Sequence, residues 1–200
     1  MTHPSSVVWC ALAVLLLTPC SGAVAAQARP VPAPFETLDL ALTVLADVNH
    51  GALHQWWSPG PAIAAGVTMP FYAGDVELGV QYASPTALRD DVPDFRSLFA
   101  FAGWSGGHGL GSGLTAGGGV RVGVMGMRFR HDTVRQLPRE SELGVAARAA
   151  LRWMPGGVWF TEAGLSYQSI LTHRRMEQVF LSVALGRRFG TPVWLRDFLD

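Results

Sequence analysis

Residues 142–153 read ELGVAARAALRW and alternate between two kinds of side chain along their whole length. The odd-numbered positions, from Leu143 to Trp153, are apolar, whereas the even-numbered positions carry small or charged residues that include Arg148 and Arg152. A period of two is typical of a β-strand with one apolar and one polar face. A tilted strand needs about nine to eleven residues to cross a bilayer, so this segment is long enough to span a membrane.

The same alternation recurs along the chain. It predicts eight strands, over residues 38–49, 63–71, 76–82, 95–104, 114–124, 142–153, 159–168 and 179–188. Residues 95–104 are apolar on both faces, so the pattern does not orient that strand.

The predicted connections alternate between short and long. Tight turns at 72–75 and 154–157 and a glycine-rich connection at 105–113 are interleaved with longer polar connections near 50–60, 84–94, 128–141 and 172–178. Short periplasmic turns and longer outer loops are typical of bacterial barrels. The sequence therefore predicts an all-β fold, an eight-stranded antiparallel up-and-down transmembrane β-barrel.

The composition narrows the class of protein. Charged residues make up 15% of the 200 residues and glycine occurs 23 times, a combination that is rare in soluble domains. The formal net charge is zero, so no global field favours nucleic acid as a partner.

Cys10 and Cys20 are the only cysteines, and both precede the expected mature chain. Disulfides, Cys-ligated metals and cysteine nucleophiles are therefore excluded from it.

The N-terminal residues 1–26 have the features of a cleavable secretory signal peptide. An apolar core over residues 7–17 is followed by Pro19 and then by small residues, with cleavage expected after Ala25 or Ala26. Lipidation of Cys20 is an alternative, although Pro19 departs from the pattern that lipidation requires. Residues 27–35 are expected to form an extended lead-in, residues 36–189 the barrel, and residues 190–200 a short C-terminal tail.

Residues 179–189 alternate and close on Phe189, which resembles the terminal signal that the barrel-assembly machinery recognises. Residues 36–189 resemble the class of small outer-membrane barrels that includes the membrane domain of outer membrane protein A. The resemblance implies a monomer in the outer membrane of a Gram-negative bacterium, surrounded by its lipid. The tail over residues 190–200 departs from the class. It either weakens the signal or forms a short amphipathic segment at the inner interface.

Charged residues at inward positions predict an ion-paired lumen. These residues are Asp39, Asp47, Glu77, Arg121, Glu142, Arg148, Arg152, Glu162 and Arg188. An isolated charge in a narrow lumen is strongly penalised, so opposite charges are expected to pair and to fill it. Because many inward positions are glycine, a porin-like polar conduit or a pocket for a small hydrophobic ligand stays open as the alternative.

Arginines also crowd two of the predicted outer loops. Arg128, Arg130, Arg135 and Arg139 fall in one loop with His131, and Arg174 and Arg175 fall in the next with His173. Guanidinium groups bind phosphate by paired hydrogen bonds, so contact with lipopolysaccharide is a hypothesis for these loops. The alternative is an ordinary solvated loop, balanced by Asp132, Glu140 and Glu177.

A catalytic role is the third hypothesis, after a structural or surface-interaction role and after narrow transport or ligand binding. Some small outer-membrane barrels are lipid A-modifying enzymes that place His with Ser at the outer rim. Four histidines, His50, His54, His131 and His173, fall in predicted outer loops. No predicted strand carries the His-x-Ser pair of a deacylase, and no phosphate-binding or metal-ligand motif is present. The sequence therefore predicts a non-enzymatic protein with no catalytic residue, cofactor or metal.

Overall fold

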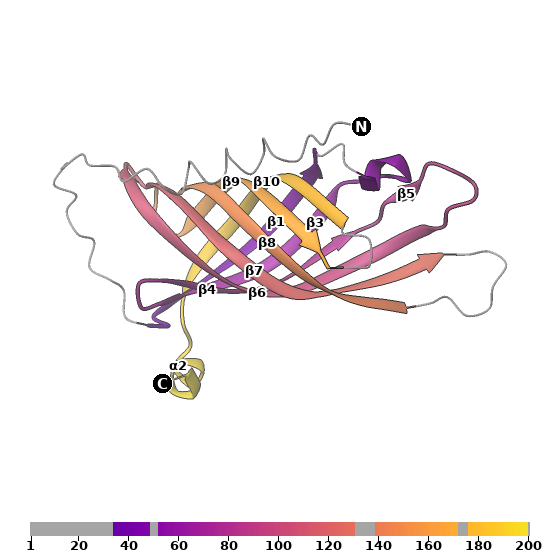
Figure 1. Ribbon diagram of the computed structural model, residues 1–200. Coiled ribbons are helices and arrows are strands. Elements are labelled where there is room, and N and C mark those ends of the chain that lie inside the picture. The colour runs from indigo at the N-terminus through magenta and orange to yellow at the C-terminus, as the bar shows by residue number, and fades with distance from the viewer. Residues whose placement is uncertain (1–33, 49–51, 131–138, 172–175, 200) are drawn as a thin grey trace. The chain divides into compact units, whose positions relative to one another are not determined.

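The computed structural model describes residues 34–48, 52–130, 139–171 and 176–199 (Figure 1). The predicted signal peptide, nearly all of the lead-in, and Arg135, Arg174 and Arg175 lie outside the described residues. No helix within the described ranges has both the length and the hydropathy that a membrane-spanning helix requires.

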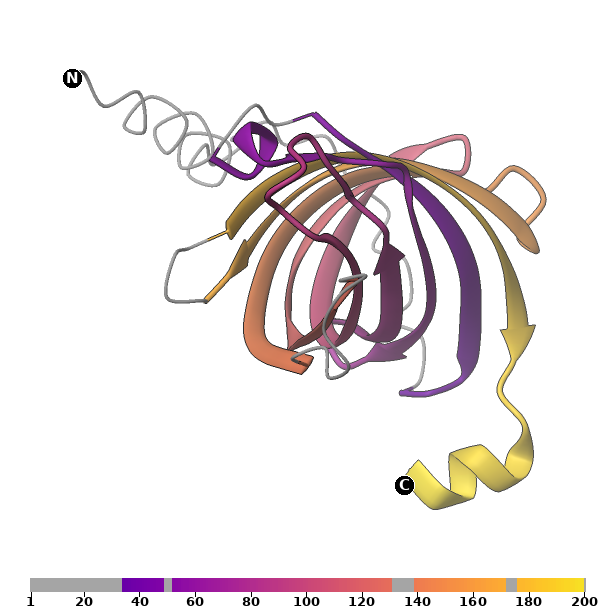
Figure 2. The same cartoon turned by 90° about the vertical axis from the view of Figure 1, so that its right-hand side faces the viewer.

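Eight strands form one closed barrel, in the spatial order β1-β10-β9-β8-β7-β6-β4-β3 (Figure 2). They are β1 (Thr37–Asp47), β3 (Ala62–Phe71), β4 (Gly74–Ala83), β6 (Asp94–Gly111), β7 (Leu114–Arg130), β8 (Arg139–Trp153), β9 (Trp159–Ile170) and β10 (Met176–Gly190). All neighbouring pairs are antiparallel, and the pairing of β1 with both β3 and β10 closes the sheet. The predicted eight-stranded barrel is confirmed.

Side-chain size and polarity decide which face of each strand is outward. Leu42 and Val44 of β1 are more than half exposed, whereas Asp39 and Leu45 on the opposite face are buried. The same alternation holds on β4, β8 and β10, where leucine and valine cover the outside. A closed barrel with an apolar outside satisfies its backbone hydrogen bonds internally, which is what a bilayer requires.

Short elements complete the fold at the two ends of the barrel. The end that carries residues 52–61 and 84–93, here the loop end, includes η1 (Ala52–Gln55) and a small sheet of β2 (Trp57–Ser58) and β5 (Thr86–Ala87). The opposite end, here the turn end, carries the tight connections and both ends of the barrel chain. Beyond β10, residues Val193–Leu199 form α2.

Two predicted connections are wrong, because β6, β7 and β8 extend further than the sequence pattern indicated. Residues 105–111 belong to β6, and only Ser112 and Gly113 lie between it and β7. Gly106 and Gly107 pair with Gly118 and Gly117, so a segment that reads as a loop continues the ladder at the turn end.

At the loop end, Arg128 and Arg130 lie on β7 and Arg139 lies on β8, not in a loop. The inward face explains why β7 continues there. Beyond Val124, the inward positions of β7 are occupied by Met125, Met127 and Phe129, which are apolar. The strand therefore continues, and Arg128 and Arg130 lie on its outward face.

The structure also orients β6, which the sequence left open. Phe95, Phe99 and Phe101 are buried and turn inward, whereas Leu98 and Trp104 are exposed on the outside. Both faces of this strand are apolar because the outside meets lipid while the inside meets an apolar part of the lumen.

Candidate functional site

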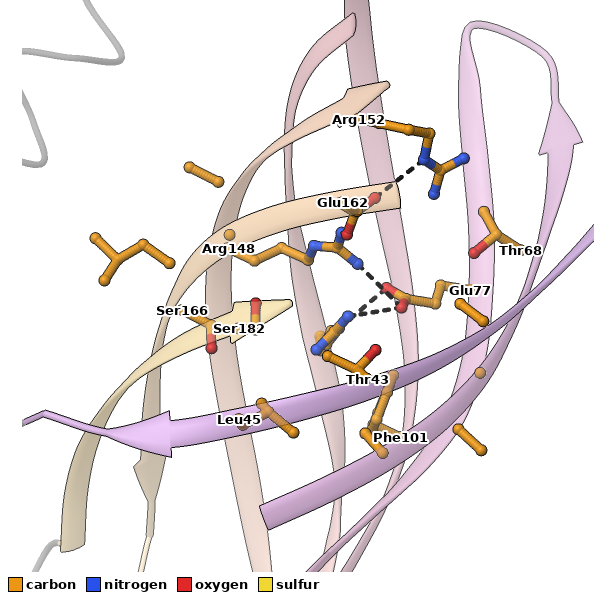
Figure 3. A pocket seen from close by; sticks show the side chains of 18 residues that line it. Thr43, Leu45, Thr68, Glu77, Phe101, Arg148, Arg152, Glu162, Ser166 and Ser182 are labelled. Carbon is orange, nitrogen blue, oxygen red and sulfur yellow. Dashed lines mark hydrogen bonds and ion pairs between the residues drawn. The ribbon is translucent and has the colours of Figure 1, made fainter. Parts of the chain in front are cut away.

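The turn-end half of the lumen contains a chain of ion pairs that joins neighbouring strands and also crosses between strands that are not neighbours. Arg121 of β7 donates two hydrogen bonds to Glu77 of β4, Nη2 to Oε1 at 2.6 Å and Nε to Oε2 at 3.0 Å. Arg148 of β8 donates to the same Glu77 Oε1 at 3.1 Å and also to Glu162 of β9. Figure 3 shows Arg148 between the two carboxylates, so one guanidinium group connects opposite walls of the lumen.

The chain continues through Arg152 to the seam of the barrel. Arg152 Nε lies 3.0 Å from Glu162 Oε2, and its Nη1 lies 2.9 Å from Asp39 Oδ2. Arg188 of β10 then donates to both oxygens of Asp39, at 2.7 and 2.8 Å. Asp39, Glu77 and Glu162 each accept from two arginines, so every carboxylate of this lumen network is shared.

Two of these arginines stack on phenylalanine rings. The guanidinium carbon of Arg121 lies 4.5 Å from the centre of the Phe101 ring, and that of Arg152 lies 4.3 Å from the centre of the Phe160 ring. Gly186 makes room for Phe160, since a Cβ at that position would lie 2.1 Å from its ring. Stacking and ion pairing together fix the planes of these guanidinium groups, which offsets part of the cost of burying them.

A small cavity of about 30 Å³ lies beside the lumen network. Small residues of β1, β3, β9 and β10 form its wall, among them Ala41, Ala64, Gly66, Gly164 and Ser182. A cavity of this size holds on the order of two water molecules. The inward glycines and alanines therefore provide space for water beside the ion pairs.

The loop-end half of the lumen contains a cluster of apolar side chains beside the buried amides of Gln81, Gln168 and Gln178. Its core, here the apolar plug, consists of Phe95, Phe99, Phe101, Met125, Met127 and Ile170, with Trp57, Phe129 and Met176 packed against it. Trp57 reaches the plug from outside the barrel sheet, held by a hydrogen bond from its Nε1 to the Pro93 carbonyl at 2.9 Å. Sequence reasoning missed the plug, although the two-residue spacing of its phenylalanines and methionines was the available signal.

Two of the charges that the sequence assigned to the lumen lie outside the lumen network. Asp47 is at the loop end of β1, where its carboxylate accepts from Gln178 Nε2 at 3.1 Å and lies 3.8 Å from His54 Nε2. Glu142 is opposite Met125 in the register of β7 and β8, and no contact among the described residues joins it to the network. The structure therefore brings together all four predicted lumen arginines with three of the five predicted acids.

Arginines also meet on the outside of the barrel at the loop end. Arg96 of β6 is the direct register partner of Arg128 of β7, and Arg128 is in turn the partner of Arg139 of β8. Arg96 and Arg128 are exposed and share the outward face with Leu98 and Val124. Two residues further along β7, Arg130 is opposite Asp94, so like charges meet at one level and opposite charges at the next.

Within the described ranges, no group of three or more His, Cys, Asp or Glu side chains is arranged to hold a metal ion.

No protein-family model and no curated protein matches this sequence. Solved structures do match its fold. Neisserial surface protein A is 12% identical with a TM-score of 0.60, and the match covers 79% of this chain and 100% of that one. The N-terminal β-barrel domain of OprF from Pseudomonas aeruginosa is 14% identical with a TM-score of 0.53, over 78% of this chain and 99% of that one.

The outer membrane protein OprG from Pseudomonas aeruginosa is 12% identical with a TM-score of 0.50, over 78% of this chain and 97% of that one. At such identities the likeness shows the fold alone, that of a small eight-stranded outer-membrane barrel. This fold, together with leucine and valine over the outer face, places the protein in the bacterial outer membrane.

Proposed function

We propose that this protein is a closed, non-enzymatic barrel that interacts with the membrane surface, and that its outward arginines bind lipopolysaccharide. The observation that supports a closed barrel is that two different layers fill the lumen. The lumen network crosses the turn-end half, and the apolar plug lies in the loop-end half together with the buried Gln81 and Gln168. An ion that crosses the barrel would have to displace both layers.

The observation that supports lipopolysaccharide as a partner is the register of the outward arginines. Directly opposite residues of an antiparallel pair have Cβ atoms about 4.5–5.5 Å apart, and like charges at that spacing destabilise the sheet. Arg128 has an arginine as its partner on both sides, Arg96 and Arg139. A phosphate bound between them would convert repulsion into attraction, and arginine binds phosphate by paired hydrogen bonds.

Lipopolysaccharide carries phosphate groups in the outer leaflet, at the level of the long loops of a barrel. The loop end is the end that carries the longer connections, which in bacterial barrels face outward. Arg96 and Arg128 lie at that end, on the outward face that also carries Leu98 and Val124. The positive charge of these arginines and their position at the loop end, which faces the outer leaflet, therefore both support lipopolysaccharide as the ligand.

The test is the amount of lipopolysaccharide that the barrel retains through purification. The double variant Arg96→Gln, Arg128→Gln is compared with the wild type, with lipid A phosphate per barrel measured by mass spectrometry. Arg187→Gln is the matched control, because Arg187 is also an exposed outward arginine but lies near the turn end. We expect retention to fall only in the double variant; equal retention in all three proteins would refute the lipopolysaccharide proposal.

The closed lumen is tested separately by conductance in planar bilayers. We expect no single-channel steps from the wild-type barrel, because an ion would have to pass both the lumen network and the apolar plug. Regular, ion-selective steps from the purified wild type would instead support narrow transport as its function.

The non-enzymatic part of the proposal has its own test. His54, a candidate rim histidine, lies 3.8 Å from Asp47, a carboxylate with a fully buried side chain. In this position the pair links η1 to β1, which is a structural role. Lipid A from a strain that overproduces the protein is expected to keep its mass, and a mass change that disappears in the His54→Ala variant would show catalysis.

A further inference from the structure

We infer that the outer face of the barrel carries a phospholipid site at the turn end, in which Arg187 holds the phosphate and an adjoining apolar groove holds the acyl chains. Arg187 and Arg188 are neighbours in sequence but lie on opposite faces of β10. Arg188 pairs with Asp39 in the lumen, whereas Arg187 is exposed on the outside, opposite Leu40 of β1 and Trp159 of β9.

Aromatic rings flank Arg187. Its guanidinium carbon lies 5.3 Å from the centre of the Trp159 ring and 5.0 Å from the centre of the Phe189 ring. These contacts orient a cation but do not neutralise it, and no carboxylate of the described residues forms an ion pair with Arg187. A cation on a lipid-facing surface is costly unless an anion meets it.

An open apolar groove of about 1130 Å³ begins at this arginine. It runs over the outside of β10, β1, β3 and β4, and Leu40, Leu42, Val67, Leu78, Val80 and Leu185 are among its lining residues. Ala65 is a small, exposed lining residue on β3, flanked in register by Leu42 and Val80. Pockets for drug-sized ligands measure about 300–1,000 Å³, so the groove has room for acyl chains.

The chemistry at the two ends of the groove identifies the occupant. A cation between aromatic rings at the interface favours a phosphate, and a leucine- and valine-lined groove favours hydrocarbon. The short connections of a barrel face the periplasm, so the turn end lies at the leaflet made of phospholipid. The site therefore fits a phospholipid of the inner leaflet, and it is separate from the arginines at the loop end.

The experiment titrates the purified barrel in nonionic detergent with phosphatidylglycerol and counts bound lipid by native mass spectrometry. We expect one tightly bound lipid on the wild type and binding weaker by about tenfold for Arg187→Gln, the loss of one charge-assisted contact. Ala65→Leu fills the groove without removing the cation, and we expect a similar loss. Arg89→Gln is the control, because Arg89 also lies over an aromatic ring, that of Trp56, but pairs with Asp91, and this variant should bind as the wild type does.

Each outcome decides one part of the inference. Unchanged binding by Arg187→Gln would overturn the headgroup site, and unchanged binding by Ala65→Leu would overturn the groove. Displacement of the lipid by an equal concentration of inorganic phosphate would show a simple anion site and would overturn the lipid assignment. Cold SDS mobility, measured for every variant, shows that the loss of lipid occurs in a folded barrel.

Discussion

Asp39 and Arg188 are direct cross-strand partners at the seam where the first and last strands of the barrel meet. The guanidinium group of Arg188 donates to both carboxylate oxygens, at 2.7 and 2.8 Å, between residues that are 149 positions apart in sequence. A slip of one residue would turn Arg188 toward lipid and bring the exposed Val183 and Leu185 of β10 into the lumen. The ion pair and the alternation of β10 therefore together select one register for closure of the barrel.

The variant Asp39→Asn should be strongly destabilised. Its carboxylate is shared by Arg152 and Arg188, so the change leaves two lumen arginines short of an acceptor. Breaking a buried pair costs about 3–5 kcal/mol, measured here as the free energy of unfolding by urea in micelles. Asp91→Asn is the control, because it breaks an ion pair with Arg89 whose side chains are 54% and 61% exposed, and exposed pairs contribute at most about 1 kcal/mol. Equal effects would contradict a stabilising role for the seam pair.

The closed sheet predicts a specific behaviour on SDS gels. Because β1 pairs with β10, the barrel has no free strand edge at which unfolding begins. Unheated protein from the outer-membrane fraction should therefore migrate differently from boiled protein. A periplasmic protein with no heat-dependent shift would show that the same alternation builds a soluble barrel.

The sequence predicts strands well where the two faces differ in polarity. On β1, the outward leucines and inward aspartates differ sharply, and the face of Asp39 follows from its position alone. The two partners of Asp39 cannot be predicted from its position. Arg188 becomes a partner only when β1 pairs with β10 to close the sheet. Arg152 becomes one only because the lumen is narrow enough for its side chain to cross it. The alternation along a strand therefore predicts which charged residues face the lumen. Which of them form ion pairs is seen only in the folded barrel.

The alternation fails as a guide where the lumen is itself apolar. Phe99 and Leu98 are adjacent and both apolar, yet one belongs to the apolar plug and the other faces outward. The same cause explains the error at Arg128. A rule that expects polar residues inside ends β7 at Val124, whereas Met125 and Met127 continue the strand into the plug.

The variant Phe99→Ala should be much less stable than Leu98→Ala. Phe99 is 1% exposed inside the apolar plug, and truncating a buried phenylalanine costs about 3–5 kcal/mol of unfolding free energy through lost contacts and a cavity. Leu98 is 51% exposed on the outside, where detergent or lipid replaces the missing methyl groups. Urea unfolding of both variants measures the difference, and similar midpoints would argue against a packed lumen.

The variant Gly186→Ala should disturb the lumen network through an aromatic ring. A Cβ at Gly186 would lie 2.1 Å from Phe160, whose ring supports the guanidinium group of Arg152. Overpacking of this kind costs about 1–3 kcal/mol, again measured by urea unfolding. A Cβ at Gly190, on the same strand, meets nothing within 4 Å, so Gly190→Ala is the control and should unfold as the wild type does.

The charge of Arg128 should destabilise the barrel in the absence of lipopolysaccharide and stabilise it when lipopolysaccharide is bound. In detergent without lipopolysaccharide, Arg128→Gln removes two like-charge cross-strand pairs, with Arg96 and Arg139, and should stabilise the barrel by about 0.2–1 kcal/mol. With lipopolysaccharide added, the wild type gains stability from phosphate binding and the variant gains less, so their order should reverse. Arg130→Gln is the control two residues along the same face, since its partner is Asp94 and loss of its charge should not stabilise the lipid-free barrel. Urea midpoints measured with and without lipopolysaccharide give the comparison, and an unchanged order of wild type and Arg128→Gln would mean that no phosphate lies between these arginines.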